Sequence, residues 1–205
     1  MIKLVLICLL ALFLPVSMAE AQEAKLPEGL KLEKSTNPVI CIETAKGNMI
    51  LELFPDSAPK HVDSMLSLIK KGFYNGLTFH RVVPGFVIQG GCPLGNGTGG
   101  PGYNVPAEFN SRKHLKGTLA MARAQHPDSA GSQFYICLGP QPFLDGQYTV
   151  FGQLRQGDDV PEKIKMGDKM TIKILQDLAK KWFCYKLKAE VYASAFLLSI
   201  NKLWA

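Results

Sequence analysis

The chain has 205 residues, a length that suits one ordinary domain with terminal extensions. Hydrophobic residues make up 47% and charged residues 20%, a globular balance that excludes long disorder. The net charge of +6 would suit a nucleic-acid-binding protein, but residues 179–205 contribute +4 of it and residues 22–178 only +2. A near-neutral body with a basic tail argues against a dedicated nucleic-acid surface.

Residues 1–21 are predicted to be an export signal. A single lysine precedes an uninterrupted apolar run over residues 4–14, which is too short to cross a bilayer comfortably, and Pro15 ends the run. Small residues then allow cleavage after Ala19 or after Ala21. The alternative is an uncleaved N-terminal anchor. The sequence therefore predicts an exported protein.

Residues 22–38 are polar and contain two prolines and a glycine, so we expect a linker or a loosely held N-terminal arm. Two β-rich runs follow, at residues 39–43 and 49–54. The Lys-Gly-Asn sequence at residues 46–48 separates them and favours a hairpin turn, because Gly and Asn tolerate positive φ.

The next segment gives the clearest helix prediction in the chain, with an end at Gly72. Asp56 or Ser57 can cap this helix, and Pro59 lies in its first turn, where a missing N–H costs little. His61 is expected on the outer face. Apolar residues at i, i+3, i+4 and i+7 line the inner face, namely Val62, Met65, Leu66 and Ile69.

The segment from residue 73 to residue 175 reads as short strands cut by Gly and Pro. The predicted strands cover residues 78–82, 86–89, 118–121, 134–137, 149–154 and 169–175. A short helical turn is expected within residues 159–165, limited by Pro161. Many short strands with few helices favour a closed barrel or a sandwich.

The C-terminal segment, residues 178–205, mixes lysines with aromatic residues and is predicted to be helical. Its apolar run at residues 191–200 is about half of a membrane span. The tail is either an interfacial helix in peripheral contact with a membrane or a helix packed on its own domain or on a partner chain.

Four cysteines follow the predicted signal, and an even number in an exported chain permits two disulfides. The preferred interpretation is that Cys41 and Cys137 are small apolar residues inside strands. Cys92 and Cys184 are the pair expected to be reactive or exposed.

Three blocks carry the chemical information. The first, FHRVVPGFVIQGG at residues 79–91, has two strands around a Pro-Gly turn and can place Arg81, Phe86 and Gln89 on one concave surface. A cation, an aromatic wall and an amide together suit the binding of a peptide. The second block is GTLAMARA at residues 117–124 with GSQFYIC at residues 131–137, and the third is FLDGQYTVFG, which begins at Phe143.

In order and spacing, these blocks resemble the cyclophilins over about residues 39–176. The resemblance implies a mainly β fold: a closed, eight-stranded antiparallel barrel over residues 39–177, with one clear capping helix and a shortened second helix. It also implies a peptidyl-prolyl cis-trans isomerase that acts on proline-containing polypeptides and needs no cofactor or metal. A monomer is expected.

Rotation about an X–Pro bond faces a barrier of about 18–20 kcal/mol because amide resonance must be broken. The enzyme needs only to stabilise the twisted amide over the planar one. The resemblance makes Arg81 the catalytic residue, whose guanidinium donates to the proline nitrogen. It assigns substrate binding to the rest of the groove: Phe86, Val87, Gln89, Ala122, Arg123, Gln133, Tyr135, Phe143, Leu144 and Tyr148.

Several positions depart from the best-known eukaryotic pattern. Val87 stands where methionine is common, and Tyr135 adds a hydroxyl where phenylalanine is usual. Arg123 in place of asparagine and Phe143 in place of tryptophan resemble bacterial members, which makes the periplasm the expected compartment. Phe143 lacks an indole N–H, so we expect weak binding of cyclosporin. Arg81 is intact, so activity is expected.

Other signals support no separate function. The GNGTGG sequence at residues 95–100 spells a dinucleotide-binding loop but opens no helix, so it is interpreted as a surface loop. Four scattered histidines give no metal site; His80 is expected to be a packed structural residue, and His114 and His126 to be loop residues. Glu108 and Asp145 are expected to be turn and loop carboxylates.

The alternative to an isomerase is a proline-peptide-binding module or holdase with little turnover.

Overall fold

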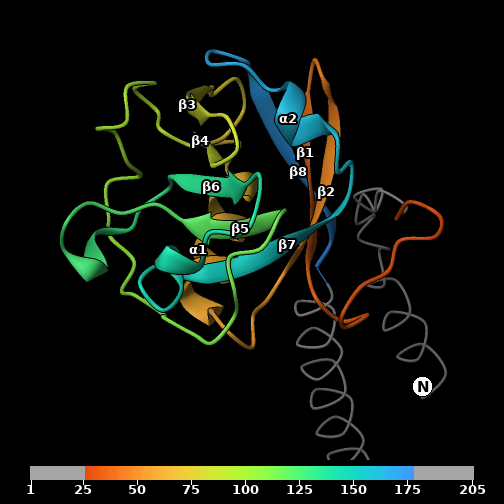
Figure 1. The fold of residues 1–205 in the computed structure, drawn as a ribbon, viewed down its shortest axis with the longest axis horizontal. Helices are drawn as coiled ribbons and strands as arrows, with labels where there is room; N and C mark the ends of the chain where they lie inside the picture. Colours follow the sequence, from red (N-terminus) through yellow and green to blue (C-terminus); the bar gives the residue numbers. More distant parts are fainter. Residues whose placement is uncertain (1–25, 178–205) are drawn as a thin grey trace, which may run out of the picture.

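The computed structural model describes residues 26–177. Eight strands form one antiparallel sheet in the order β3-β4-β6-β5-β7-β2-β1-β8 (Figure 1). The eight predicted strands are all present, and their ends agree with the prediction to within two residues. The strands are β1 (Val39–Thr44), β2 (Gly47–Leu53), β3 (Phe79–Val83), β4 (Val87–Gly90), β5 (Thr118–Met121), β6 (Phe134–Cys137), β7 (Val150–Gln156) and β8 (Met170–Gln176).

The sheet curls until its two end strands, β3 and β8, approach each other. They meet through a single bridge between Thr78 and Lys169, beside two backbone hydrogen bonds that Phe79 makes with Asp168 and Gly167. The mainly β, eight-stranded antiparallel fold is thus confirmed. The barrel is closed by this short contact rather than by a continuous ladder.

Strand alternation gives the sheet two apolar faces. On β1, Ile40 and Ile42 point into the central core, whereas Val39 and Cys41 belong to a cluster on the other side. That cluster is covered by three leucines of the preceding arm, Leu26, Leu30 and Leu32. A third cluster forms on the outer side of β4, β5 and β6, where short loops cover it only in part.

Helix α1 (Pro59–Lys70) is capped by a residue far away in the sequence. Its N-cap residue, Ala58, makes no side-chain hydrogen bond. Instead, the carboxylate of Glu108 accepts the backbone N–H groups of Lys60 and His61, both at 3.0 Å. The same carboxylate bonds to Nδ1 of His61 at 2.7 Å, which explains why His61 is buried rather than on the predicted outer face.

The prediction that Asp56 or Ser57 caps α1 is wrong because other partners occupy both side chains. Asp56 pairs with the Lys34 ammonium at 2.7 Å, and the hydroxyl of Ser57 accepts a hydrogen bond from Arg112 Nε at 2.8 Å. A cap supplied from a loop replaces the local one, so the first-turn N–H groups are still satisfied.

Helix α1 ends before Gly72 as predicted, and the φ of +68° at Gly72 favours glycine.

The remaining helices are short. The short second helix is α2 (Val160–Lys163), which contacts β2, and α1 contacts β8. Two 3₁₀ turns, η1 (Pro127–Ser129) and η2 (Pro142–Leu144), lie in the loops around the partly covered outer face.

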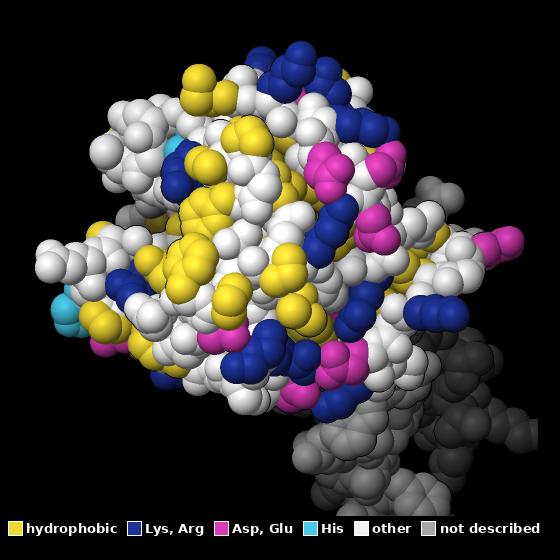
Figure 2. All heavy atoms as spheres, viewed as in Figure 1, with side chains coloured by type: hydrophobic (Ala, Val, Ile, Leu, Met, Phe, Trp, Pro, Cys, Tyr) yellow, Lys and Arg dark blue, Asp and Glu magenta, His cyan; other side chains and the backbone are white. Residues whose placement is uncertain are grey.

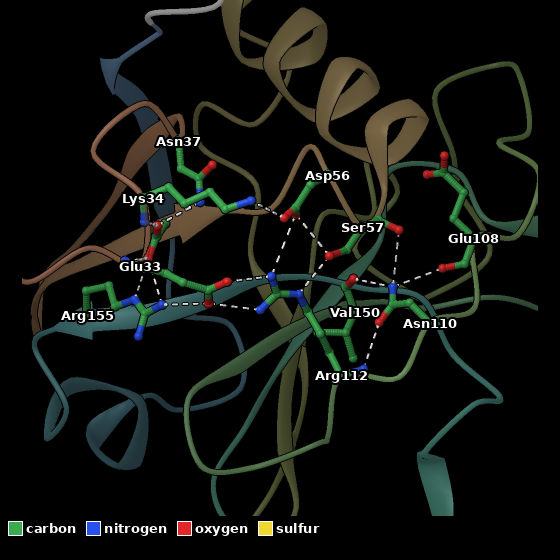
Figure 3. Close-up of polar contacts among 11 residues, drawn as sticks. Glu33, Lys34, Asn37, Asp56, Ser57, Glu108, Asn110, Arg112, Val150 and Arg155 are labelled. Carbon is green, nitrogen blue, oxygen red and sulfur yellow. Dashed lines mark hydrogen bonds and ion pairs between the residues drawn. The ribbon is translucent and has the colours of Figure 1, made fainter.

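A group of ionic contacts, here called the arm clasp, joins the N-terminal arm to the barrel (Figure 3). Its centre is Glu52, a fully buried carboxylate on β2. Glu52 accepts hydrogen bonds from the backbone N–H groups of Glu33 and Lys34 and from the Asn37 amide, and Arg155 donates to it at 2.7 Å. Glu33 in turn receives two hydrogen bonds from the Arg112 guanidinium, at 3.0 and 2.8 Å.

The predicted export signal (residues 1–21), the start of the arm (residues 22–25) and the predicted C-terminal tail (residues 178–205) lie outside the described residues. Within residues 26–177, no helix is long and apolar enough to cross a membrane. Those predictions therefore stay predictions.

Candidate active site

A cavity of about 180 Å³ opens on the outer face of β4, β5 and β6. Apolar side chains gather over β5 and β6 in the space-filling view of this face (Figure 2). The buried part of the cluster beneath the cavity includes Val87, Ala120, Tyr135 and Leu144. The cavity is lined by Arg81, Phe86, Val87, Gln89, Ala122, Arg123, Tyr135, Leu144 and Tyr148. We refer to it below as the small cavity.

Arg81 and Gln89 come from neighbouring strands and lie opposite each other in the β3–β4 ladder. A long contact of 3.5 Å joins Arg81 Nη1 to the Gln89 side-chain oxygen, and the guanidinium lies 5.5 Å from the centre of the Phe86 ring. Arg81 is exposed and pairs with no carboxylate among residues 26–177. Most of its donors are therefore available to a ligand.

Gln133 connects the small cavity to a larger cavity of about 600 Å³ beside it. Its side-chain oxygen accepts from the Gln89 amide at 3.2 Å. Its side-chain nitrogen donates to the carbonyls of Gly97 and Gly99, both at 2.8 Å. The glycine-rich loop therefore forms one wall of the larger cavity, and the two amides form a polar boundary between the cavities.

Two residues from the third sequence block complete the rim of the small cavity. Phe143, in η2, is 61% exposed and stacks on Phe86 with ring centres 5.7 Å apart. Tyr148 packs edge-on against Tyr135 at 5.9 Å, and the Arg123 guanidinium lies 4.7 Å from the Tyr148 ring centre. The rim thus consists of aromatic rings with one cation above them.

Comparison with known proteins agrees with this geometry. The family model described as cyclophilin type peptidyl-prolyl cis-trans isomerase/CLD matches residues 39–178. The chain belongs to this isomerase family.

Relatives and a solved structure support the assignment. A peptidyl-prolyl cis-trans isomerase from Synechococcus elongatus is 50% identical over 141 residues, which are 67% of this chain and 97% of that protein. A peptidyl-prolyl cis-trans isomerase from Helicobacter pylori is 52% identical over 131 residues, which are 62% of this chain and 80% of that protein. A crystal structure of a Cryptosporidium parvum cyclophilin type isomerase has a TM-score of 0.63 and 33% identity, and covers 67% of this chain and 97% of that one. The activity is therefore peptidyl-prolyl cis-trans isomerisation.

The structure brings most of the predicted site residues of the isomerase together. Nine of the eleven line the small cavity. The other two border it: Gln133 lines the larger cavity, and Phe143 stacks on the rim. The Arg123 side chain donates to three backbone carbonyls, those of Ala124, Gln125 and Gln147. Its guanidinium is thus engaged within the chain.

The sequence did not indicate what lies behind the cavity. His114 and Asp145 are in loops as predicted, but His114 is buried, with Nδ1 3.0 Å from Asp145 and Nε2 3.0 Å from the Tyr135 hydroxyl. These partners are 31 and 21 residues away in the chain. No local sequence pattern predicts contacts over such separations. The one sequence feature that pointed to them is Tyr135, which stands where phenylalanine is usual.

The cysteines differ in their surroundings. Cys41 and Cys137 are buried in strands as predicted, and burial raises their pKa values to about 11 and about 12. Cys92 is also buried rather than exposed. Burial opposes ionisation of Cys92, but backbone N–H groups, including those of Gly99 and Gly97 at 3.2 Å, lower the pKa of its thiol overall.

In the part of the chain that the structure describes, no three His, Cys, Asp or Glu side chains are grouped so that they could hold a metal ion. His80, which neighbours Arg81, is partly buried, and neither of its ring nitrogens has a hydrogen-bond partner among the described residues. The site therefore offers a guanidinium, two amides and an aromatic pocket for its chemistry.

Proposed function

We propose that the isomerase acts on exported polypeptides and that Arg81 is its catalytic residue, with the small cavity as the pocket for the substrate proline ring. The observation that carries the proposal is a guanidinium that pairs with no carboxylate among residues 26–177, at the edge of a cavity of about 180 Å³ whose lining includes Phe86, Val87 and Leu144. A small cavity with apolar walls beside an exposed cation suits one ring next to a polar amide.

The chemistry follows from the twisted amide. When the X–Pro bond rotates, the proline nitrogen becomes pyramidal and regains a lone pair, which the planar amide lacks. A donor placed at that nitrogen binds the twisted state more strongly than either planar state, and only such a difference accelerates the reaction. Arg81 has the fixed charge and the forked donors for this role.

The remaining groups hold the peptide while the bond turns. Phe86, Val87 and Leu144 offer apolar walls for the ring. Gln89 and Gln133 have amides next to the cavity that suit the substrate backbone. The larger cavity beside Ala122 extends the groove toward the residues that precede proline.

Export is supported by the pattern of residues 1–21, a single lysine followed by an apolar run and small residues. Slow proline isomerisation takes tens to hundreds of seconds without catalysis, so a catalyst is useful wherever chains fold after transport. Expression of the full chain in a bacterium, with cell fractionation, tests this part. Recovery of a shortened chain in the periplasmic fraction supports export, and a full-length chain confined to the cytosol contradicts it.

The catalytic role is tested with the Arg81→Ala variant in a protease-coupled assay on a short X-Pro peptide. We expect kcat/KM to fall by roughly 10²- to 10³-fold, as when a single transition-state donor is removed. Peptide affinity should fall much less, and the thermal midpoint should stay unchanged because the side chain is exposed. Lys46→Ala, an exposed cation in the β1–β2 turn, is the matched control.

The same assay distinguishes a catalytic isomerase from the alternative, a proline-peptide-binding module with little turnover. That alternative predicts slow isomerisation by the unmodified chain and no further effect of Arg81→Ala. If the variant keeps full activity while the unmodified chain is active, the role of Arg81 is wrong.

A further inference from the structure

A buried histidine lies directly behind the small cavity, and both of its ring nitrogens are hydrogen-bonded. The His114 side chain is fully buried. Its Nδ1 lies 3.0 Å from Oδ1 of Asp145, and its Nε2 lies 3.0 Å from the hydroxyl of Tyr135. The rings of His114 and Tyr135 also stack, with an interplanar angle of 18°. Asp145, His114 and Tyr135 therefore form one continuous chain of polar contacts, here called the pocket chain.

The chemistry of the three groups fixes the direction of each hydrogen bond. The backbone N–H of His114 and its Nδ1 both donate to Asp145, which lowers the pKa of that carboxyl to about 2 and keeps it ionised. Burial lowers the pKa of His114, although the bond to Asp145 opposes the shift. The ring is then neutral with its proton on Nδ1, so Nε2 can only accept, and the Tyr135 hydroxyl must donate.

The pocket chain adjoins two of the residues that line the small cavity. Tyr135 sits in β6 between Gln89 of β4 and Ala120 of β5, and its ring lines the cavity. Because His114 holds the hydroxyl, the ring is presented to the cavity and the polar atom is turned away from it. Asp145 directly follows Leu144, another lining residue, and the Gln141 N–H donates to the His114 carbonyl at 2.7 Å.

We infer that His114 and Asp145 are positioning residues of the isomerase, which hold the Tyr135 ring and the Leu144 wall in place around the substrate proline, an inference that rests on the proposed use of the small cavity as the proline pocket. Neither residue touches the substrate. Each acts through a side chain that does.

A purely structural role makes a different prediction, and the same chain offers a control. His61 is also fully buried and bonds to a carboxylate, Glu108, at 2.7 Å. Its other ring nitrogen has no hydrogen-bond partner within residues 26–177, and its ring lies near Phe151 in the central core. His61→Gln therefore tests the loss of a buried histidine–carboxylate pair that has no contact with the small cavity.

The first measurement uses the unmodified chain. Long-range ¹H–¹⁵N NMR correlations should show His114 as the neutral tautomer with its proton on Nδ1 at pH 7. A Tyr135 hydroxyl proton should be protected from exchange. A doubly protonated ring or the opposite tautomer at this pH would overturn the inference without any variant.

The second measurement is a double-mutant cycle of Tyr135→Phe and His114→Ala, with kcat and KM measured separately. Each single variant should raise KM by roughly three- to tenfold with little change in kcat, because the pocket holds the proline ring in the ground and transition states alike. In the Tyr135→Phe background, His114→Ala should raise KM by less than it does alone. His61→Gln should leave KM unchanged even where it lowers stability.

The outcomes separate this inference from the assignment of the pocket. If Arg81→Ala abolishes turnover while the two single variants leave KM unchanged, the site assignment stands and the positioning role is wrong. If the two KM effects multiply independently, His114 does not act through Tyr135, and the inference is also wrong. If the single variants lower only the active fraction, as a merely structural residue would, KM stays constant and the inference fails in the same way.

Discussion

The small cavity and the arm clasp use the same kinds of side chain in opposite ways. In the clasp, Arg155 and Arg112 are held by carboxylates at 2.7 and 2.8 Å, and the central carboxylate, Glu52, is fully buried and receives several donors. At the cavity, the side-chain hydrogen bond that Arg81 makes within residues 26–177 is a long contact of 3.5 Å to an amide oxygen. One region satisfies its charges within the chain, whereas the other leaves a charge available.

The difference separates stability from function. A buried carboxylate must be hydrogen-bonded because an unpaired buried charge is costly, so the clasp is closed to ligands. An exposed guanidinium over an aromatic ring costs little to keep unpaired, since water solvates it until a substrate arrives. Removal of a clasp residue should therefore affect unfolding, and removal of Arg81 should affect turnover.

The largest effect on stability is expected from Glu52→Ala. The substitution leaves two backbone N–H groups, the Asn37 amide and the Arg155 guanidinium without their common acceptor. The free energy of unfolding should fall by about 3–5 kcal/mol, as measured for broken buried pairs. Chemical denaturation monitored by circular dichroism measures it.

The activity of the folded variant completes this test. At a temperature where Glu52→Ala remains folded, its kcat/KM should equal that of the unmodified chain, because no clasp residue lines the small cavity. A large loss of kcat/KM in the folded state would show that the two regions are coupled and would contradict the comparison.

The two regions also differ in how far the sequence predicts them. The strands around the cavity follow from short apolar runs between glycines and prolines. The pattern around the Pro-Gly turn indicated Arg81, Phe86 and Gln89, and resemblance to a known family supplied the other eight predicted site residues and the roles of all eleven. The clasp was not predicted: residues 22–38 read as a linker or loose arm because polar composition does not reveal that Glu33 meets Arg112, 79 residues later. The cap of α1 was missed for the same reason, because Glu108 lies 47 residues after His61.

A smaller effect is expected from pH. Burial lowers the pKa of His61, against the opposing bond to Glu108, so the unfolded chain binds a proton more readily than the folded one. Stability from His61 is then fully present above the unfolded value of about 6.5 and is lost as pH falls through the folded pKa. The slope contributed by one such group is at most about 1.4 kcal/mol per pH unit.

His61→Gln tests the sign of this dependence. Between pH 7 and pH 5, its free energy of unfolding should fall less steeply than that of the unmodified chain. Above pH 7 the two curves should run parallel, because neither state takes up a proton there. A steeper fall in the variant would mean that the histidine is charged in the folded state and would reverse the assignment. Burial lowers the pKa of His114 as well. A variant that combines His61→Gln with His114→Ala should therefore show a still weaker dependence of its free energy of unfolding on pH.

The smallest effect is expected at the rim of the cavity, where Phe143 is 61% exposed and stacks on Phe86. Phenylalanine has no hydrogen-bond donor, whereas tryptophan adds an indole N–H without losing the aromatic face. We expect Phe143→Trp to tighten binding of cyclosporin by roughly two- to tenfold, the effect of one added hydrogen bond, measured by isothermal titration calorimetry. Isomerisation of a short X-Pro peptide should change little, since the exposed ring borders the pocket rather than filling it. Unchanged cyclosporin affinity in a folded, active variant would mean that the missing donor does not limit binding. The expected weak binding would then have its cause in the walls of the cavity itself, where Val87 and Tyr135 also depart from the eukaryotic pattern.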